Sequence, residues 1–308
     1  MEKIEAERFF QIMTWKENLI KLYFYICEDR DIQRHLATLR MSNNQQQTFT
    51  DEEVMTVYVF GIVSGRTKVR HIYDYTRNHL PDWFPQLPSY QAFDHRLNQL
   101  SACFEVLVYS VSGYALLQYS SNEQIIDSLP IVVSGSNNYS ACVAPQLCNK
   151  GYCASKSMYY YGLRLHVTAL VRPCHMPLPA ASWITGAEEN DLTAARPLFE
   201  QLSNCKVYAD KIYRDQPMNA RMQTSQNATI ITPVKKKVGQ QLVDAAATLL
   251  SAAVSRVRQP IESLFSWMIE KTQIQYAQRV RSEKGLLVHV WGKFAAALFL
   301  LANILTLD

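Results

Sequence analysis

The chain has 308 residues, of which 48% are hydrophobic and 19% are charged, as in an ordinary soluble globular protein. This length is enough for one large domain or two ordinary domains with a substantial core. The formal net charge is only +4, so it hints at an anionic partner without identifying one.

The seven cysteines are odd in number, form no CxxC pair and follow no secretory signal. This pattern argues against a disulfide framework and favours the reducing cytoplasm. Cys142, Cys148 and Cys153 cluster in the sequence, so a zinc site is conceivable. Unligated thiols are the preferred interpretation, because zinc sites use tighter Cys-x2–4-Cys spacing.

Residues 1–118 are predicted to be almost entirely helical. Apolar residues recur at helical spacing between Ile4 and Cys27, and a polar linker follows. The next helix begins with Thr50 and Glu53, which fit a capping box, and it ends at Gly65.

Two further helices flank a turn-rich stretch that begins at Pro81, and Ser89 is the expected N-cap of the second. Helix, turn and helix, with arginines such as Arg96 on the last element, resembles a helix-turn-helix reader of DNA. The alternative is a helical bundle that only packs against the rest of the chain.

From about residue 120 the pattern becomes mixed α/β. Helices are expected over 188–202, over 214–225 and from Gln240 onward, and a long loop over 134–156. The predicted strands cover 125–133, 159–171, 178–185, 205–210 and 228–234.

The apolar C-terminal segment is expected to be a buried helix. His289, Lys293 and Asn303 interrupt it, and the longest uninterrupted apolar run, 294–302, is short for a membrane span of roughly 20 residues. No membrane partner is therefore predicted.

Asp127 lies in the middle of the first predicted strand, where an unpaired carboxylate would cost several kcal/mol. Asp210 ends the fourth strand, and Glu262 lies in the helix after the fifth. Each acid has a structural alternative: Asp127 as a turn cap, Asp210 as an acceptor of backbone hydrogen bonds, and Glu262 as a first-turn residue after Pro260. An ion pair of Glu262 with Arg258, four residues earlier, would add only about a few tenths of a kcal/mol.

Taken together, the three acids favour a metal site. Strand neighbours would bring two carboxylates to one sheet edge, and a packed helix would add the third. Such a cluster repels itself unless cations lie between its members. Mg²⁺ suits it, and two ions about 4 Å apart stabilise both oxygens of an in-line phosphoryl transfer.

Four motifs in this part of the chain resemble those of bacterial insertion-sequence transposases of the DDE type. They are "IDSLPI", "YYGLRLH", "YADKIYRD" and "RQPIESLF", within residues 120–306. The resemblance implies an RNase H-like fold, here a mixed five-stranded sheet flanked by helices and preceded by a helical N-terminal domain. The expected domains are residues 1–118 and residues 119–308.

By matching motif, Asp127, Asp210 and Glu262 stand at the three catalytic and metal-binding positions of this family. Gly162 and His166 match a strand motif in which Arg164 replaces the usual lysine, and Arg258 matches the arginine before the glutamate.

Three positions depart from the family pattern: Ser255 replaces a tyrosine, Ile269 a lysine, and Ile212 a small residue. These departures bear on DNA-end binding and leave open a copy with weakened activity.

Basic residues cluster around the predicted site, as expected for a protein that binds the phosphate backbone. A solvated basic loop is the alternative for the lysine run. The DNA-binding candidates are Lys211, Lys235, Lys236, Lys237, Arg256, Arg258, Lys271 and Arg96.

The sequence thus predicts a transposase that cuts and joins DNA at the ends of its own insertion sequence. The expected cofactor is Mg²⁺ as two ions, with Mn²⁺ as a substitute. The expected partners are element ends and target DNA, bound by a homodimer in the bacterial cytoplasm at the nucleoid. The alternatives are a nuclease of the same core without strand joining and a non-catalytic DNA-binding derivative.

Overall fold

The computed structural model describes residues 15–39, 47–135, 143–153, 157–234 and 244–306. Contacts divide the chain into two compact units, Met1–Val111 with Trp291–Asp308, and Ser112–Val290. The predicted division at residues 118 and 119 lies close to the first of these boundaries. Trp291–Asp308 groups with the N-terminal helices, whereas the sequence placed it in the second domain. The functional assignment of the two domains stays a prediction.

The first unit is helical, as expected. Its helix α3 (Asp51–Val63) is apolar on all sides and packs against several of the others, which explains why nearly every residue of α3 is buried. The other helices are α1 (Trp15–Glu28), α2 (Arg30–Leu39), α4 (Val69–His79), α5 (Tyr90–Gln99) and α11 (Lys293–Leu301), and α6 (Ser101–Gln118) continues into the second unit.

Local capping predictions in this unit are confirmed. Thr50 Oγ1 accepts from the Glu53 backbone N–H at 3.2 Å, and Glu53 Oε2 accepts from the Thr50 N–H at 2.6 Å. Gly65 follows the helix with φ of +80°, a conformation that glycine adopts at little cost. Ser89 caps α5 by accepting from the Ala92 N–H. The predicted helical segment before Trp15 lies outside the described residues.

The second unit contains a six-stranded mixed sheet, one strand more than predicted. The additional strand is β2 (Asn149–Cys153), which the sequence analysis placed in a loop. It is short and carries asparagine, lysine and glycine, which are weak strand formers, so its pairing with β3 decides its structure. The other strands are β1 (Glu123–Gly135), β3 (Met158–Leu170), β4 (Leu178–Gly186), β5 (Lys206–Tyr208) and β6 (Thr229–Ile231).

The strand order is β2-β3-β1-β5-β6, and β4 also pairs with β3. β1 is antiparallel to β3 along its length and parallel to β5 over Glu123–Ile125. The close approach of β1 explains why β3 has a glycine at position 162. A Cβ there would lie 2.0 Å from the Ile131 carbonyl oxygen. β1 and β3 therefore approach more closely here than a side chain allows.

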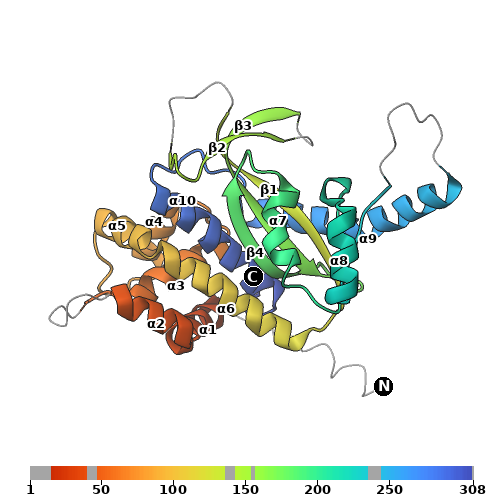
Figure 1. Ribbon diagram of the computed structural model, residues 1–308. Coiled ribbons are helices and arrows are strands. Elements are labelled where there is room, and N and C mark those ends of the chain that lie inside the picture. Colours follow the sequence, from red (N-terminus) through yellow and green to blue (C-terminus); the bar gives the residue numbers. More distant parts are fainter. Residues whose placement is uncertain (1–14, 40–46, 136–142, 154–156, 235–243, 307–308) are drawn as a thin grey trace, which may run out of the picture. The chain divides into compact units, whose positions relative to one another are not determined.

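Helices cover the sheet of the second unit (Figure 1). α7 (Asp191–Phe199) and α8 (Gln216–Ser225) pack against it through a core that includes Ile126, Val207 and Ala209. The long helix α9 (Ala245–Thr272) contacts β1 and β5. This arrangement confirms the predicted mixed α/β fold, a mixed sheet flanked by helices.

The C-terminal apolar segment continues through α10 (Glu283–Leu287) and a π-helical turn into α11. Glu283–Leu301 is long and apolar enough to cross a membrane by composition, but 72% of its apolar window is buried inside the structure. Eight of the nine α11 residues are buried, so the predicted buried helix is confirmed.

Candidate active site

Strand register brings two of the predicted acids together. β1 and β5 run parallel, with Ile125 opposite Tyr208, so two residues further along Asp127 comes beside Asp210. Side chains alternate between the faces of a strand. Ile126 and Ala209 point into the core beneath α7 and α8, so Asp127 and Asp210 lie on the opposite face.

Arg258 of α9 binds the two acids on this face. Its Nη2 donates to Asp127 Oδ2 at 2.9 Å, and its Nη1 lies 3.8 Å from Asp210 Oδ1. The side chains of Arg258 and Asp127 are 12% and 26% exposed, whereas that of Asp210 is 40% exposed. Three separate elements therefore converge on one cluster of charge.

The environment of Asp127 raises its pKa to about 6. Burial is the largest cause, and Asp191 adds to the increase by repulsion. Arg258 and the Ser128 backbone N–H, which donates to Asp127 Oδ1 at 2.8 Å, oppose it. At neutral pH the carboxylate is mostly ionised and can serve as an oxygen ligand for a cation.

Glu262 occupies the same helix as Arg258, four residues later. Residues at this spacing lie on the same face of a helix, one turn apart. The Glu262 side chain is exposed. In the described ranges, no three His, Cys, Asp or Glu side chains form a group that could hold a metal ion. The structure thus brings Asp127 and Asp210 together, while the convergence of all three acids stays a prediction.

Asp191 is a nearby acid that the sequence analysis did not single out, and its charge contributes to the raised pKa of Asp127. It opens α7, and both of its oxygens accept from Arg164 Nη1, at 2.9 and 2.8 Å. Arg164 also donates to the Ala187 and Tyr152 carbonyl oxygens. The sequence signal for Asp191 was its place in the first turn of a helix, which by itself indicates only a favourable helix dipole.

His166 lies beside this pair on β3 and is fully buried. Its Nδ1 is 3.8 Å from Asp191 Oδ1, its Nε2 hydrogen-bonds with Thr185 Oγ1 at 2.8 Å, and its ring stacks on Trp183. Burial lowers the pKa of His166, against the attraction of Asp191. His166 is therefore neutral at pH 7, and its hydrogen bond with Thr185 and its stacking on Trp183 join β3 to β4.

The predicted DNA-binding residues of this unit differ in their solvent exposure. Lys211 directly follows Asp210 and is exposed, as is Arg256 on α9. Lys271 is partly buried, with its Nζ 3.2 Å from Glu270 Oε1. Lys235, Lys236 and Lys237 lie outside the described residues, as does Cys142 of the conceivable zinc cluster. Cys148 and Cys153 are buried.

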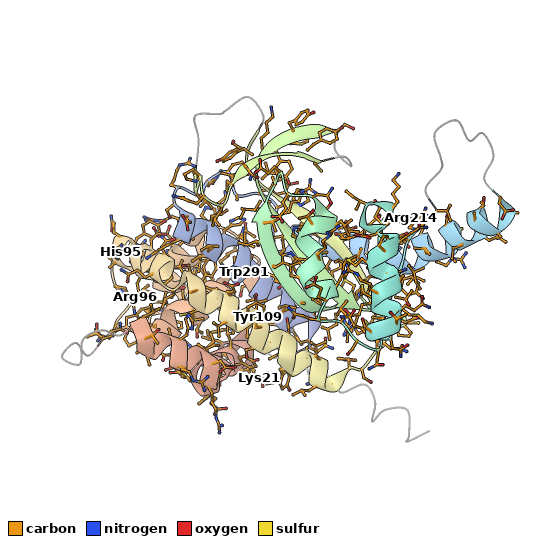
Figure 2. The ribbon with its side chains drawn as sticks, in the orientation of Figure 1. Lys21, His95, Arg96, Tyr109, Arg214 and Trp291 are labelled. Carbon is orange, nitrogen blue, oxygen red and sulfur yellow. The ribbon has the colours of Figure 1, made fainter. Side chains whose placement is uncertain are left out.

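Arg96, the candidate from the first unit, lies on α5 (Figure 2). Its Nε and Nη2 donate to the two oxygens of the buried Asp51, each at 2.6 Å, and its Nη1 donates to Gln99. The side chain is 24% exposed. Arg96 therefore joins α5 to α3, and any DNA contact from it stays a prediction.

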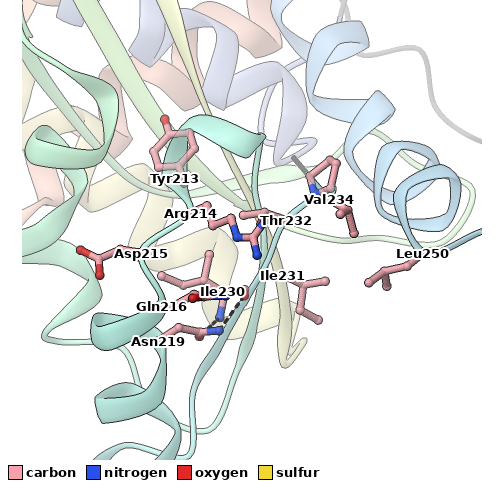
Figure 3. Close-up of a pocket in the computed structure, with 11 residues that line it drawn as sticks. Tyr213, Arg214, Asp215, Gln216, Asn219, Ile230, Ile231, Thr232, Val234 and Leu250 are labelled. Atoms are coloured by element: carbon pink, nitrogen blue, oxygen red, sulfur yellow. Dashed lines mark hydrogen bonds between the residues drawn. The ribbon is translucent and has the colours of Figure 1, made fainter. Parts of the chain in front are cut away.

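A pocket of about 260 Å³ lies at the carboxyl end of β6, which pairs with β5, the strand that precedes Asp210. Ligands of open α/β sheets bind at this end of the strands. Figure 3 shows the lining side chains, with the Arg214 guanidinium lying toward Thr232. They belong to Tyr213, Arg214, Asp215, Gln216, Asn219, Ile230, Ile231, Thr232, Pro233, Val234 and Leu250.

Fold and site agree with an RNase H-like enzyme whose paired acids lie within β1, at Asp127, and directly after its parallel neighbour β5, at Asp210. The family model of the transposase DDE domain matches residues 120–299, more than half of the chain. The chain belongs to this family and is a DNA transposase, an enzyme that cleaves and joins DNA strands. No curated protein matches the sequence.

The acidic site fits the divalent metal ions that DDE transposases generally use. Two carboxylates contact the same guanidinium, and the side chain of Asp210 is 40% exposed, so the Asp210 carboxylate is accessible from solvent. Mg²⁺ binds through one or two carboxylates and completes its coordination with water and phosphate oxygens.

Proposed function

We propose that this transposase acts on the ends of an insertion sequence, and that Asp127, Asp210 and Glu262 hold two Mg²⁺ ions, with Mn²⁺ as a substitute. The observation that supports this proposal is the pair of Asp127 and Asp210 on one face of the sheet, both facing Arg258. Two such ions, when bound, stabilise the attacking and leaving oxygens of phosphoryl transfer.

The protein's own groups hold and orient the reacting strand. Asp127 is the most buried of the three acids, and its hydrogen bonds to Ser128 and Arg258 fix its orientation. Arg258 limits the repulsion between Asp127 and Asp210 before DNA binds. Glu262, one turn along α9, completes the acidic set from the solvent side. Lys211, which follows Asp210 and is exposed, contacts a phosphate in this proposal.

Other DNA contacts complete the proposal. Arg256 and Lys271 on α9 and the lysines at 235–237 would bind the phosphate backbone, and such contacts are salt-sensitive. The N-terminal helices would recognise the element ends, with Arg96 near the DNA. Pairing of two ends calls for a homodimer, and a soluble enzyme acting on DNA would work at the nucleoid.

The decisive experiment incubates purified protein, Mg²⁺ and DNA that carries the flanking element ends, and sequences the joined products. Asp127→Asn, Asp210→Asn and Glu262→Gln should each reduce cleavage and joining by orders of magnitude while DNA binding persists. Glu200→Gln is the control, because Glu200 is an exposed acid at the C-terminal end of α7 and has no role in the proposed site. It should leave both steps intact.

Three results would contradict the proposal. Cleavage without joined products would favour the nuclease alternative, and DNA binding without cleavage by the parent protein would favour the non-catalytic derivative. Full activity in Glu262→Gln would remove Glu262 from the metal-binding set.

A further inference from the structure

The outward face of the β2–β3 hairpin carries three tyrosines and a lysine. Lys150 pairs with Tyr161 and Tyr152 pairs with Tyr159 across the two strands. These four side chains, here called the tyrosine ladder, share one face because side chains alternate along a strand. The residues between them point the other way, and Tyr160 and Cys153 are buried in a small apolar core with Val132.

The ladder presents aromatic faces to solvent. Tyr152 and Tyr159 are 45% and 55% exposed, and their ring centroids lie 4.9 Å apart. Lys150 Nζ lies 5.0 Å from the Tyr159 ring centroid. Tyrosine is a good strand former, but β propensity alone does not place a cation over exposed rings. Surfaces that bind single-stranded nucleic acid combine aromatic rings, on which bases stack, with positively charged groups that contact the backbone.

We propose that the tyrosine ladder binds unpaired nucleotides of the DNA strand on which the transposase acts, an inference that rests on the proposed function. Bases stack on Tyr152 and Tyr159, and Lys150 contacts a phosphate. Each stacked base contributes about 5- to 150-fold in affinity, with little dependence on sequence. Lys150 supplies positive charge to this face, and none of the four side chains is acidic, so no carboxylate of the ladder repels a polyanion.

Strand β3 connects the ladder to the acidic site. Val167 lies opposite Asp127, and Tyr161 precedes Val167 by six residues. At about 3.3 Å per residue, the nearer end of the ladder is about 20 Å along the sheet from Asp127. Stacked nucleotides advance about 3.4 Å each, so the ladder should meet a strand about six nucleotides from the reacting phosphate.

The test measures binding of the full chain to two DNAs without divalent metal, so that no cleavage occurs. One is a blunt element-end duplex, and the other carries a ten-nucleotide single-stranded extension at the reacting end. Replacing both Tyr152 and Tyr159 with alanine should weaken binding of the extended DNA by tenfold or more and leave binding of the blunt duplex unchanged. The paired Tyr152→Phe and Tyr159→Phe variant keeps the rings and should bind as the parent does.

A second measurement uses only the parent protein, in case the alanine variant does not fold. A 2-aminopurine base placed singly along the extension should be quenched most strongly about six nucleotides from the duplex. Equal loss for both DNAs, unchanged binding of the extended DNA or uniform quenching would each overturn the proposal. A change in oligomeric state alone, seen by light scattering, would reassign the face to protein contacts and overturn it too.

The experiments distinguish an error in the tyrosine-ladder proposal from an error in the proposed function. If the parent cleaves and joins element ends while the alanine variant binds the extension normally, only the ladder proposal is wrong. If the parent binds neither DNA, both proposals are wrong.

Discussion

The ion pair between Arg258 and Asp127 should couple the energies of two residues that are 131 positions apart in the sequence. At 2.9 Å and an effective dielectric constant of 20, two unit charges attract by about 6 kcal/mol before desolvation is subtracted. Hydrogen bonds to charged groups retain about 1.5–3 kcal/mol of this. The longer contact to the more exposed Asp210 adds little.

We therefore predict that Arg258→Gln lowers the free energy of unfolding at pH 7 by about 2–4 kcal/mol, because it leaves the Asp127 charge without its partner. In an Asp127→Asn background, the same substitution should cost about 1.5–3 kcal/mol less. Urea unfolding of the parent, the two single variants and the double variant measures this coupling. An Arg258→Gln cost that is equal in both backgrounds would refute the ion-pair reasoning.

The raised pKa of Asp127 predicts that the stability of the folded protein depends on pH. Because the folded-state pKa is raised to about 6, above the unfolded value of 3.8, the folded protein binds more protons in this window. The stability that protonated Asp127 contributes to the fold is fully present below pH 3.8 and is lost as the pH rises to about 6. Asp127→Asn removes this loss, so at pH 7 the variant should be as stable as the parent or more stable. A variant that is less stable than the parent only above pH 6 would contradict the assignment.

Three further predictions address residues outside the proposed acidic set. Asp191→Asn should destabilise the fold by about 3 kcal/mol, because it leaves the partly buried Arg164 without its ion pair, and a loss below about 1 kcal/mol in urea unfolding would contradict this. Gly162→Ala should cost about 1–3 kcal/mol, since the new methyl group would meet the Ile131 carbonyl, and an unchanged melting temperature would contradict the close approach of the strands. Lys293→Met should stabilise the protein at pH 7. Burial lowers the Lys293 pKa to about 7, so parent stability should rise with pH between about 7 and 10.5, by at most about 1.4 kcal/mol per unit, and the variant should lack that increment.

Features that depend on neighbours in the sequence could be predicted from it. The Thr50–Glu53 capping box, the Ser89 cap and the apolar α11 each involve groups within a few residues of one another, so local patterns suffice. The long strands β1 and β3 carry enough β-branched and aromatic residues to be recognised alone. Asp127 could also be singled out, because a charge within an apolar strand is costly unless it is paired or binds a metal, and Asp210 could be singled out as the acid that follows another strand.

Tertiary structure decided what depends on pairing between distant segments. β2 forms because β3 lies beside it, and its own residues are weak strand formers. The sequence offered Glu262 as the helical partner of Arg258, but the register of β1 and β5 presents Asp127 and Asp210 to that guanidinium instead. Asp191 looked like an ordinary first-turn acid until β3 placed Arg164 and His166 beside it. Strand register and helix packing set these distances, and neither can be read from residue types because each depends on the whole sheet.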